Sequence, residues 1–369
     1  MANGVRSKLS FAGLTVGVGQ ATNDQRLETS IYIGGSMKVI ILLAGYGTRM
    51  RPHTWSRPKP LLNVAGNTIV GHILDLMKEL TTEEVVFVVG YKGDQIEAWI
   101  RENYPHLDTH FVVQEKALGQ AHAVWLCQDY LDDGEVVVAF GDGIIEADYA
   151  GMANPEVDGV ILVEEIEDPR RFGVAVLDEA GFITGFIEKP PTMEHKMAIA
   201  GINWFRSGRQ LFEATDQILE QQRQTLGEYF MVDAYQVMLE NGARMRTMQL
   251  EQWADAGTPE AILDTNARLL SVGYNTDDAL ERSFSENFTI IPPVYLPESV
   301  NIEAAVIGPY ASIGPEATIT NAIVRNSIVD QGATIENCIL DGALVGENAR
   351  VTGCAKSLFI GDNSTVETG

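Results

Sequence analysis

The sequence predicts an α/β protein in which a mostly parallel sheet is followed by a left-handed parallel β-helix. Two observations support this prediction. Short apolar runs alternate with amphipathic segments from Met37 to about Leu270, a pattern typical of parallel strands covered by helices on both faces. Beyond about Tyr295, aliphatic residues recur every six positions, which is the mark of hexapeptide repeats coiled into a β-helix.

Val39–Leu43 is a continuous, β-branched apolar run of the kind found in strands that are buried on both faces. Further strands are expected over 84–90, 109–114, 135–140, 159–164, 172–177 and 182–188, the last two joined by a turn at 178–181. Helices are expected over 68–80, 94–102, 119–130, 208–224 and 229–241, with Asp94 as an N-cap. Because ligands of such sheets bind beyond the carboxyl ends of the strands, the strand-end residues are candidate site residues.

The hexapeptide spacing is clearest at Ile307, Ile313 and Ile319, with small residues between them. Stacked coils bury such aliphatic residues against their neighbours, whereas the alternative is the edge of an ordinary β-sandwich. We therefore expect a first domain over 37–270, a linker over 271–294 and the β-helix over 295–369. The repeat is still in register near Gly369, which favours a homo-oligomer formed through the β-helix.

Residues 1–36 differ from this pattern. They hold a short, glycine-interrupted apolar run without a convincing cleavage site. Gly34-Gly35-Ser36 then precedes Met37, as a flexible linker would. We interpret 1–36 as a fused or vector-derived leader; the alternative is a native extension with a strand at 29–33.

Composition excludes several classes of partner. A net charge of −25 argues against nucleic acid, because binding a phosphate backbone needs a broad basic face. No apolar run approaches the length of a membrane span. The three cysteines are scattered and odd in number, which indicates reduced thiols in a cytoplasmic protein and no zinc site.

The stretch after the first strand is rich in glycine and positive charge. Gly45 and Gly47 allow a sharp turn and close approach to a ligand. From Met37 to Gly66 the chain carries five Lys/Arg residues and no acid. Backbone N–H groups and cations together indicate a polyphosphate-binding site; the alternative is a tight turn with a solvated basic face.

The string Gly45-Tyr46-Gly47-Thr48-Arg49-Met50-Arg51-Pro52, with Pro58-Lys59-Pro60 behind it, closely resembles the signature of sugar-1-phosphate nucleotidyltransferases. The resemblance implies a Rossmann-like sheet and an enzyme that joins a nucleoside triphosphate to a sugar 1-phosphate. With the β-helix, the chain looks most like the long glucose-1-phosphate thymidylyltransferases or uridylyltransferases. One departure is His53, where the family usually carries an apolar residue.

The resemblance also implies roles for the residues of the nucleotide site. Arg49 would bind the leaving pyrophosphate, and Lys59 would bind phosphates near the reacting centre. The residues expected to contact the nucleotide are Leu43, Gly45, Gly47, Thr48, Gln114 and Gly119. Lys116 and Ala117 stand where a proline is often found, so the base is not determined.

Two aspartates resemble the family's Mg²⁺ ligands: Asp142, which follows the strand EVVVAF, and Asp255, in WADAGTP. The alternatives are a turn cap for Asp142 and an acid at a helix N-terminus for Asp255. Glu188-Lys189-Pro190 resembles the family's E-K-P, which implies that Lys189 binds the sugar phosphate. Glu188, Gly173 and Asn203 would then contact the sugar.

Such a reaction needs positioned cations and a metal more than covalent help from the protein. We expect dTTP or UTP as donor and glucose 1-phosphate as acceptor. Alternatives are a mannose-1-phosphate guanylyltransferase and a non-catalytic nucleotide-sugar-binding subunit. A bifunctional enzyme with an acyltransferase β-helix is disfavoured, because all six histidines precede residue 196 and acyl transfer generally uses a histidine base.

Overall fold

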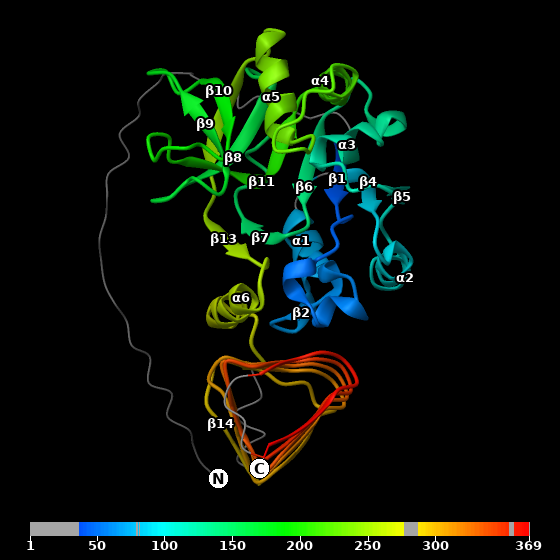
Figure 1. Ribbon diagram of the computed structural model, residues 1–369, viewed down its shortest axis with the longest axis vertical. Coiled ribbons are helices and arrows are strands. Elements are labelled where there is room, and N and C mark those ends of the chain that lie inside the picture. Colours follow the sequence, from blue (N-terminus) through cyan, green and yellow to red (C-terminus); the bar gives the residue numbers. More distant parts are fainter. Residues whose placement is uncertain (1–36, 79, 81, 277–286, 354–357, 369) are drawn as a thin grey trace, which may run out of the picture. The chain divides into compact units, whose positions relative to one another are not determined.

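The computed structural model describes residues 37–78, 80, 82–276, 287–353 and 358–368, so the expected leader lies outside them. A nine-stranded sheet runs in the order β10-β9-β11-β6-β1-β4-β5, with β8 paired to β11 and β12 paired to β8 (Figure 1). The strands are β1 (Met37–Leu42), β4 (Thr82–Val89), β5 (Thr109–Val113), β6 (Val136–Phe140), β8 (Gly159–Glu165), β9 (Gly173–Leu177), β10 (Ile183–Glu188), β11 (Met197–Phe205) and β12 (Met245–Gln249).

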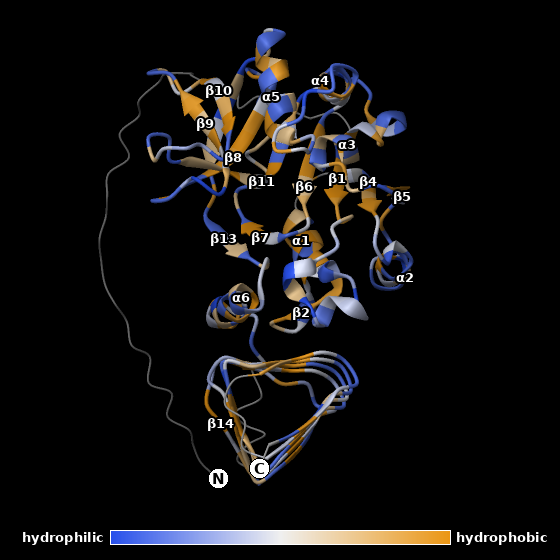
Figure 2. Ribbon diagram, in the orientation of Figure 1, coloured by the Kyte–Doolittle hydropathy of each residue, from blue (hydrophilic) through white to orange (hydrophobic). Residues whose placement is uncertain are grey.

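Strand β1 lies at the centre of this sheet and is parallel to both β4 and β6. Its side chains alternate between two hydrophobic cores: Val39 and Ile41 belong to one, and Ile40 belongs to the other. This two-sided burial explains the continuous apolar run (Figure 2). The mostly parallel sheet predicted from sequence is confirmed; β11 is antiparallel to its neighbours β6, β8 and β9.

Helices cover both faces of the sheet. One core includes side chains from α1 (Ile69–Met77), α2 (Gly93–Asn103) and α6 (Pro259–Ser271). The other includes side chains from α3 (Gln120–Trp125), α4 (Gly208–Glu220) and α5 (Met231–Glu240). No helix in the described ranges is both long enough and apolar enough to cross a membrane.

Two local predictions about helices were wrong. The helix expected over 119–130 ends at Trp125, and a separate 3₁₀ turn, Gln128–Tyr130, follows. The N-cap of α2 is Lys92, which lies in the left-handed region at φ 55° and makes no side-chain cap bond. Asp94 therefore lies in the first turn of α2, where a carboxylate is favourable beside the helix dipole but caps no N–H group.

The C-terminal strands form three parallel sheets around a triangular β-helix (Figure 1). The first sheet contains β14 (Phe288–Ile290), β17 (Ala305–Ile307), β20 (Ile323–Arg325) and β23 (Ile339–Asp341). The second contains β15 (Val294–Tyr295), β18 (Ala311–Ile313), β21 (Ile328–Val329), β24 (Leu344–Val345) and β26 (Phe359–Ile360). The third contains β16 (Asn301–Glu303), β19 (Thr318–Thr320), β22 (Thr334–Glu336), β25 (Arg350–Gly353) and β27 (Thr365–Thr368).

The six-residue spacing is the spacing of the β-helix core. Ile307, Ile313 and Ile319 are fully buried, one in each of the three sheets. The first stacked strand, β14, begins at Phe288, inside the stretch expected to be a linker. Two adjacent prolines, Pro292 and Pro293, follow it and hide the six-residue period there.

One buried side chain, Asn266 of α6, joins the first domain to the β-helix. Its Oδ1 accepts from the Ala65 N–H at 2.9 Å and from the Ser312 hydroxyl at 2.6 Å. Its Nδ2 donates to the Tyr310 carbonyl at 3.1 Å. Asn266 is fully buried, so removing its amide breaks all three bonds inside the protein.

We therefore expect Asn266→Ala to lower the thermal unfolding midpoint by about 5–10 °C, because three buried bonds are lost at about 1 kcal/mol each. Asn241→Ala, at the exposed end of α5, is the matched control and should change the midpoint little. Scanning calorimetry measures both. Equal midpoints for the two variants would contradict the bridging role of Asn266.

Candidate functional site

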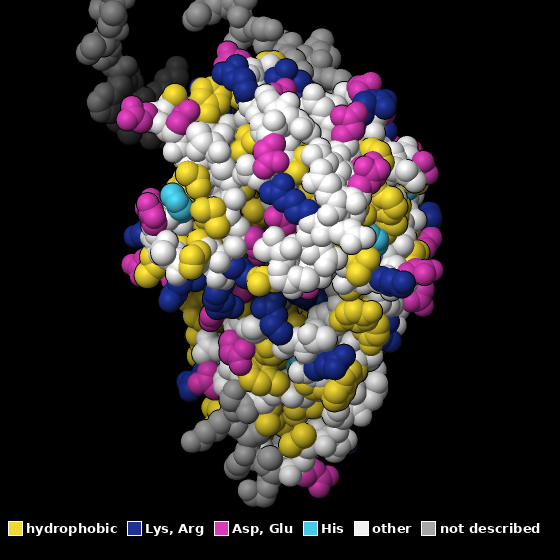
Figure 3. Space-filling model, turned by 45° about the horizontal axis from the view of Figure 1, so that its top comes forward, with side chains coloured by type: hydrophobic (Ala, Val, Ile, Leu, Met, Phe, Trp, Pro, Cys, Tyr) yellow, Lys and Arg dark blue, Asp and Glu magenta, His cyan; other side chains and the backbone are white. Residues whose placement is uncertain are grey.

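Two cavities lie at the carboxyl ends of β1 and β6, with volumes of about 490 and 440 Å³. Four residues line both cavities and mark where they meet: Arg49, Gln120, Phe140 and Asp142. We call the first the nucleotide cavity and the second the sugar cavity, after the residues expected in each. On the face shown in Figure 3, Lys and Arg side chains gather around a hollow, with acidic side chains among them.

The glycine turn after β1 is held in place by the side chain of Thr54. Gly47 has φ +59°, and a Cβ there would lie 3.0 Å from the Thr54 side chain. The Thr54 hydroxyl donates to the Gly47 carbonyl at 2.8 Å, and Met50 is fully buried in the core. The turn therefore presents its backbone to the nucleotide cavity in a conformation that favours glycine.

Two cations from this stretch reach the junction of the cavities. Lys59 begins the 3₁₀ turn η3 (Lys59–Leu61), and its Nζ donates to the Asp142 carbonyl at 3.2 Å. Burial lowers the pKa of Lys59, while Asp142 and Asp255 act to raise it and Arg49 acts to lower it. Arg49 forms no ion pair within the part of the chain that the structure describes, so its guanidinium is available to a bound anion.

The two predicted metal ligands lie together. Asp142 follows β6, and Asp255 ends β13 (Gln252–Asp255), which pairs with β7 (Gly143–Glu146) so that Asp255 is opposite Gly143. The Ala256 N–H donates to the Asp142 carbonyl at 3.1 Å, and the Gly257 N–H donates to Asp255 Oδ1 at 2.8 Å. Both aspartates line the sugar cavity beside Arg49.

This donor set fits a divalent cation. Mg²⁺ is usually held by one or two carboxylates and completes its shell with water and substrate phosphates. Among the described residues, no three His, Cys, Asp or Glu side chains form a cluster of the kind that holds a metal without substrate. Asp142 and Asp255 therefore fit an ion that binds together with phosphates.

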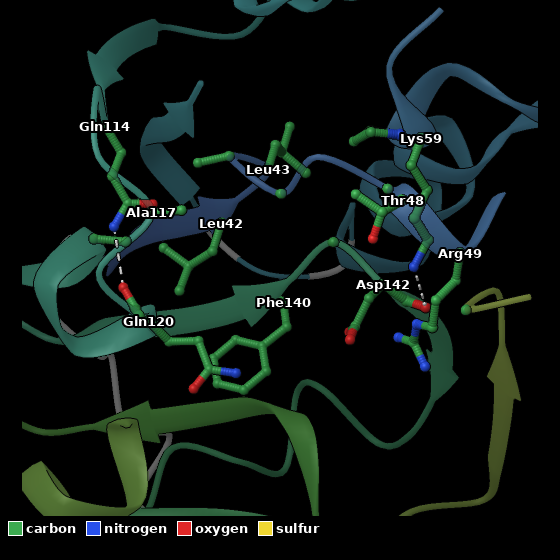
Figure 4. Close-up of a pocket in the computed structure, with 18 of the residues that line it drawn as sticks. Leu42, Leu43, Thr48, Arg49, Lys59, Gln114, Ala117, Gln120, Phe140 and Asp142 are labelled. Carbon is green, nitrogen blue, oxygen red and sulfur yellow. Dashed lines mark hydrogen bonds between the residues drawn. The ribbon is translucent and has the colours of Figure 1, made fainter. Parts of the chain in front are cut away.

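The opposite end of the nucleotide cavity is built around Gln114 (Figure 4). Its Nε2 lies 3.0 Å from the Gly119 carbonyl and 2.9 Å from His122 Nδ1. Because a carbonyl only accepts, the Gly119 bond fixes the orientation of the Gln114 amide. Both hydrogens of Nε2 are then used, and Oε1 is left as the acceptor offered to the cavity. Burial lowers the pKa of His122, which keeps Nδ1 able to accept.

In the sugar cavity, Glu188 lies opposite Gly173 in the β9–β10 pair, and a Cβ at Gly173 would lie 2.9 Å from Glu188 Oε2. Lys189 has φ +46°, a strained value for a lysine. Its Nζ lies 3.8 Å from Glu188 Oε1 and 4.9 Å from the centre of the Phe230 ring. Burial raises the pKa of Glu188 to about 7 against the opposing charge of Lys189.

The structure brings most of the predicted residues to these two cavities. Those lining the nucleotide cavity are Leu43, Gly45, Gly47, Thr48, Arg49, Lys59, Gln114, Gly119 and Asp142. Those lining the sugar cavity are Arg49, Asp142, Gly173, Glu188, Lys189 and Asp255.

Asn203 is the exception. It is fully buried and lines neither cavity. Its Oδ1 accepts from the Leu162 N–H, while its Nδ2 donates to the Ala200 carbonyl and lies 3.2 Å from the Tyr235 hydroxyl. The direct sugar contact predicted for Asn203 is therefore corrected: the amide supports the wall behind Tyr235, which does line the sugar cavity.

Three cations of the acid-free stretch also lie outside the cavities: Lys38, Arg51 and Arg57. Lys38 Nζ lies 2.9 Å from Asp132 and 3.5 Å from Glu84. Arg57 pairs with Asp330 and Glu347 of the β-helix. Absence of acids in the local sequence did not mean absence of acids in space, because these partners lie far away along the chain.

Sequence reasoning assigned no role to several lining residues. Trp253 lies in the motif WADAGTP, and Gln120 directly follows Gly119, a predicted nucleotide contact, so the sequence marks both positions. Phe140, Arg171 and Glu228 lay outside any assigned role, and no spacing in the sequence distinguishes them from ordinary surface or core residues.

Comparison with known proteins gives a consistent result. A family model described as nucleotidyl transferase matches residues 38–272. The chain is 28% identical over 321 residues to the low-salt glycan biosynthesis nucleotidyltransferase Agl11 of Haloferax volcanii, covering 79% of this chain and 87% of that one. It is 30% identical over 240 residues to the UTP–glucose-1-phosphate uridylyltransferase AglF of the same organism, covering 63% and 96%.

A crystal structure from Bacillus anthracis, of a proposed glucose-1-phosphate thymidylyltransferase in complex with a sucrose, aligns with a TM-score of 0.55 and 26% identity. It covers 63% of this chain and 95% of that chain.

The raised pKa of Glu188 predicts a pH-dependent stability. An unfolded glutamate ionises near its usual 4.5, whereas folded Glu188 keeps its proton to about 7. The folded state thus binds more protons between these values, and stability falls as pH rises through them. We expect the thermal midpoint of Glu188→Gln, relative to that of the natural protein at the same pH, to increase from pH 5 to pH 8.

The control is Glu179→Gln, in the exposed turn between β9 and β10, which should follow the natural protein at each pH. Calorimetry at pH 5, 6, 7 and 8 gives the comparison. A difference between Glu188→Gln and the natural protein that stays constant with pH would refute the raised pKa.

Proposed function

The chain belongs to the nucleotidyl transferase family, and we propose that its donor is dTTP or UTP and its acceptor is glucose 1-phosphate. It is a sugar-1-phosphate nucleotidyltransferase, which joins a nucleotidyl group to a sugar 1-phosphate and releases pyrophosphate. The observation that supports our assignment of the site most strongly is the meeting of the two cavities at Arg49 and Asp142. One cavity suits a triphosphate and the other suits a phosphorylated sugar.

The reaction is an in-line displacement. A phosphate oxygen of the sugar 1-phosphate attacks the α-phosphorus of the triphosphate, the bond to the β-phosphate oxygen breaks, and pyrophosphate leaves with that electron pair. Positioning and charge neutralisation account for most of the catalysis in such a reaction. Arg49 would bind the leaving pyrophosphate, Lys59 the phosphates near the reacting centre, and Lys189 the phosphate of the sugar.

The family uses a divalent metal, and we propose Mg²⁺ held by Asp142 and Asp255. When bound, it supplies positive charge to the phosphate oxygens that meet there. The nearby Lys59 and Arg49 would then neutralise the negative charge of the phosphates that the ion leaves. Asp255 is oriented for this role by the Gly257 N–H, which occupies its Oδ1.

The orientation of Gln114 supports the choice of base. Its Oε1 accepts, so it matches a base whose ring nitrogen carries a hydrogen. Thymine and uracil carry this hydrogen at N3 and guanine carries it at N1, whereas adenine N1 and cytosine N3 are acceptors. The amide is therefore compatible with dTTP, UTP and GTP, which can donate to it through a ring N–H. The names of AglF and of the Bacillus anthracis protein favour the pyrimidines.

We propose the sugar contacts on similar grounds. Glu188 offers carboxyl oxygens to sugar hydroxyls, and Gly173 leaves the backbone of β9 open to the sugar. Lys189 is held at the cavity edge over the Phe230 ring. A homo-oligomer through the β-helix and a cytoplasmic location remain predictions from the sequence.

A substrate panel tests this proposal. Each of dTTP, UTP, GTP, ATP and CTP is combined with glucose, mannose, galactose or N-acetylglucosamine 1-phosphate, and pyrophosphate release is measured. We expect the highest kcat/KM for dTTP or UTP with glucose 1-phosphate. Preference for GTP with mannose 1-phosphate would support the guanylyltransferase alternative, and no release from any pair would support a non-catalytic subunit.

Asp142→Asn should lower kcat on the order of 10²–10³-fold, the loss typical of removing one charge-stabilising group. The fold should remain intact, because the backbone bonds of Asp142 do not use the carboxylate. Asp129→Asn, an exposed acid near the end of α3, is the control. Near-normal turnover of the Asp142 variant across a Mg²⁺ titration would rule out its metal role.

A further inference from the structure

One corner of the β-helix carries acids toward the first domain. Asp330, Glu347 and Asp362 follow the strands β21, β24 and β26 of the same sheet, one from each of three successive coils. We call these three residues the acidic corner. Neighbouring coils present their corners side by side, so the three carboxylates fall in a row.

Arg57 contacts two members of the acidic corner at once. Its Nη1 lies 2.9 Å from Asp330 Oδ2, and its Nη2 donates to Glu347 Oε2. The Arg57 side chain is 19% exposed and that of Asp330 is 10% exposed, so water screens the pair weakly. The carboxylates outweigh burial and raise the pKa of Arg57.

Neighbours of Arg57 make parallel contacts with the same corner. Asn63 Nδ2 donates to Asp330 Oδ1, and the Ser56 hydroxyl donates to Asp362 Oδ2. A Cβ at Gly361 would lie 3.2 Å from Pro52, so the backbones are close there. The loop from Pro52 to Asn63 therefore contacts all three coils.

This loop also holds one of the cations of the nucleotide cavity. Lys59 lies two residues after Arg57, and its Nζ reaches the Asp142 carbonyl at the junction of the two cavities. Arg57 lines neither cavity. Any effect of Arg57 on substrate must then act through the position of the loop, and through Lys59 above all.

We propose that the acidic corner positions the loop from Pro52 to Asn63 through Arg57, so that the β-helix contributes to the triphosphate site. Arg57 is a positioning residue in this account, and Asp330 and Glu347 are its anchors. The inference rests on the proposed function in one respect, the binding of triphosphate near Lys59. It assigns to the repeat domain a role beyond stability or assembly.

The test removes the anchors without touching the cavities. Asp330→Asn and Glu347→Gln keep side-chain size and remove charge, and we use each alone and both together in the full chain. The double variant should raise the KM for the triphosphate about tenfold or more while the KM for the sugar 1-phosphate stays within about twofold.

Matched controls come from the same β-helix. Glu336 pairs with Arg350 at 2.7 Å, and Asp341 pairs with Arg325 at 2.9 Å; among the described residues, no hydrogen bond or ion pair joins either acid to the loop. Glu336→Gln and Asp341→Asn remove charges of the same kind and should leave both KM values unchanged. Thermal midpoints for all variants separate loss of folding from loss of positioning.

Arg57→Gln and Arg57→Lys keep the inference testable if the double variant fails to fold. Arg57→Gln should raise the triphosphate KM, Arg57→Lys should restore part of it, and Asp330→Asn should add little in the Arg57→Gln background. Unchanged triphosphate KM in the folded variants, equal rises for both substrates, or equal effects in the controls would overturn the inference. Those outcomes leave transferase activity in place, whereas no pyrophosphate release from the natural protein would overturn the proposed function itself.

Discussion

Repulsion between two phosphorylated substrates is the constraint on which this structure depends. A triphosphate and a sugar 1-phosphate must meet within bonding distance, inside a chain whose net charge is −25. The chain provides positive charge locally. Arg49 and Lys59 lie at the junction of the two cavities, beside carboxylates suited to a divalent ion. Dissolved salt screens the electrostatic effect of the acidic surface over a short distance. The few charged groups at the junction therefore determine the potential at the bound phosphates.

The sheet explains how distant residues reach one point. Parallel pairing of β1 with β6 places the glycine turn and Asp142 at one edge, and the small β7–β13 pair places Asp255 opposite Gly143. Strands β9 and β10, which carry Gly173 and Glu188 of the sugar cavity, join the same sheet through β11. The β-helix contacts the loop that carries Lys59, through the pairing of Arg57 with Asp330.

The sheet, the β-helix and most of the residues that line the two cavities could be predicted from the sequence, because periodicity or a motif marks them. The roles of single residues could not be predicted where contacts with distant parts of the chain determine them. Asn203 lies in a matching segment, yet its amide is used by Leu162, Ala200 and Tyr235 inside the core. Arg57 belongs to the acid-free stretch that was expected to bind phosphate, but its acidic partners lie hundreds of residues away along the chain. Asp94 had the right chemistry for a cap, but the backbone turned at Lys92.

The central claim is that Asp142 and Asp255 share one divalent ion with the phosphates of both substrates. A crystal structure with Mn²⁺, a non-hydrolysable triphosphate and sugar 1-phosphate tests it, because the anomalous signal of Mn²⁺ locates the ion directly. We expect a single strong peak about 2 Å from a carboxylate oxygen of each aspartate and from phosphate oxygens. An ion bound by phosphates alone, with both carboxylates turned away, would contradict it.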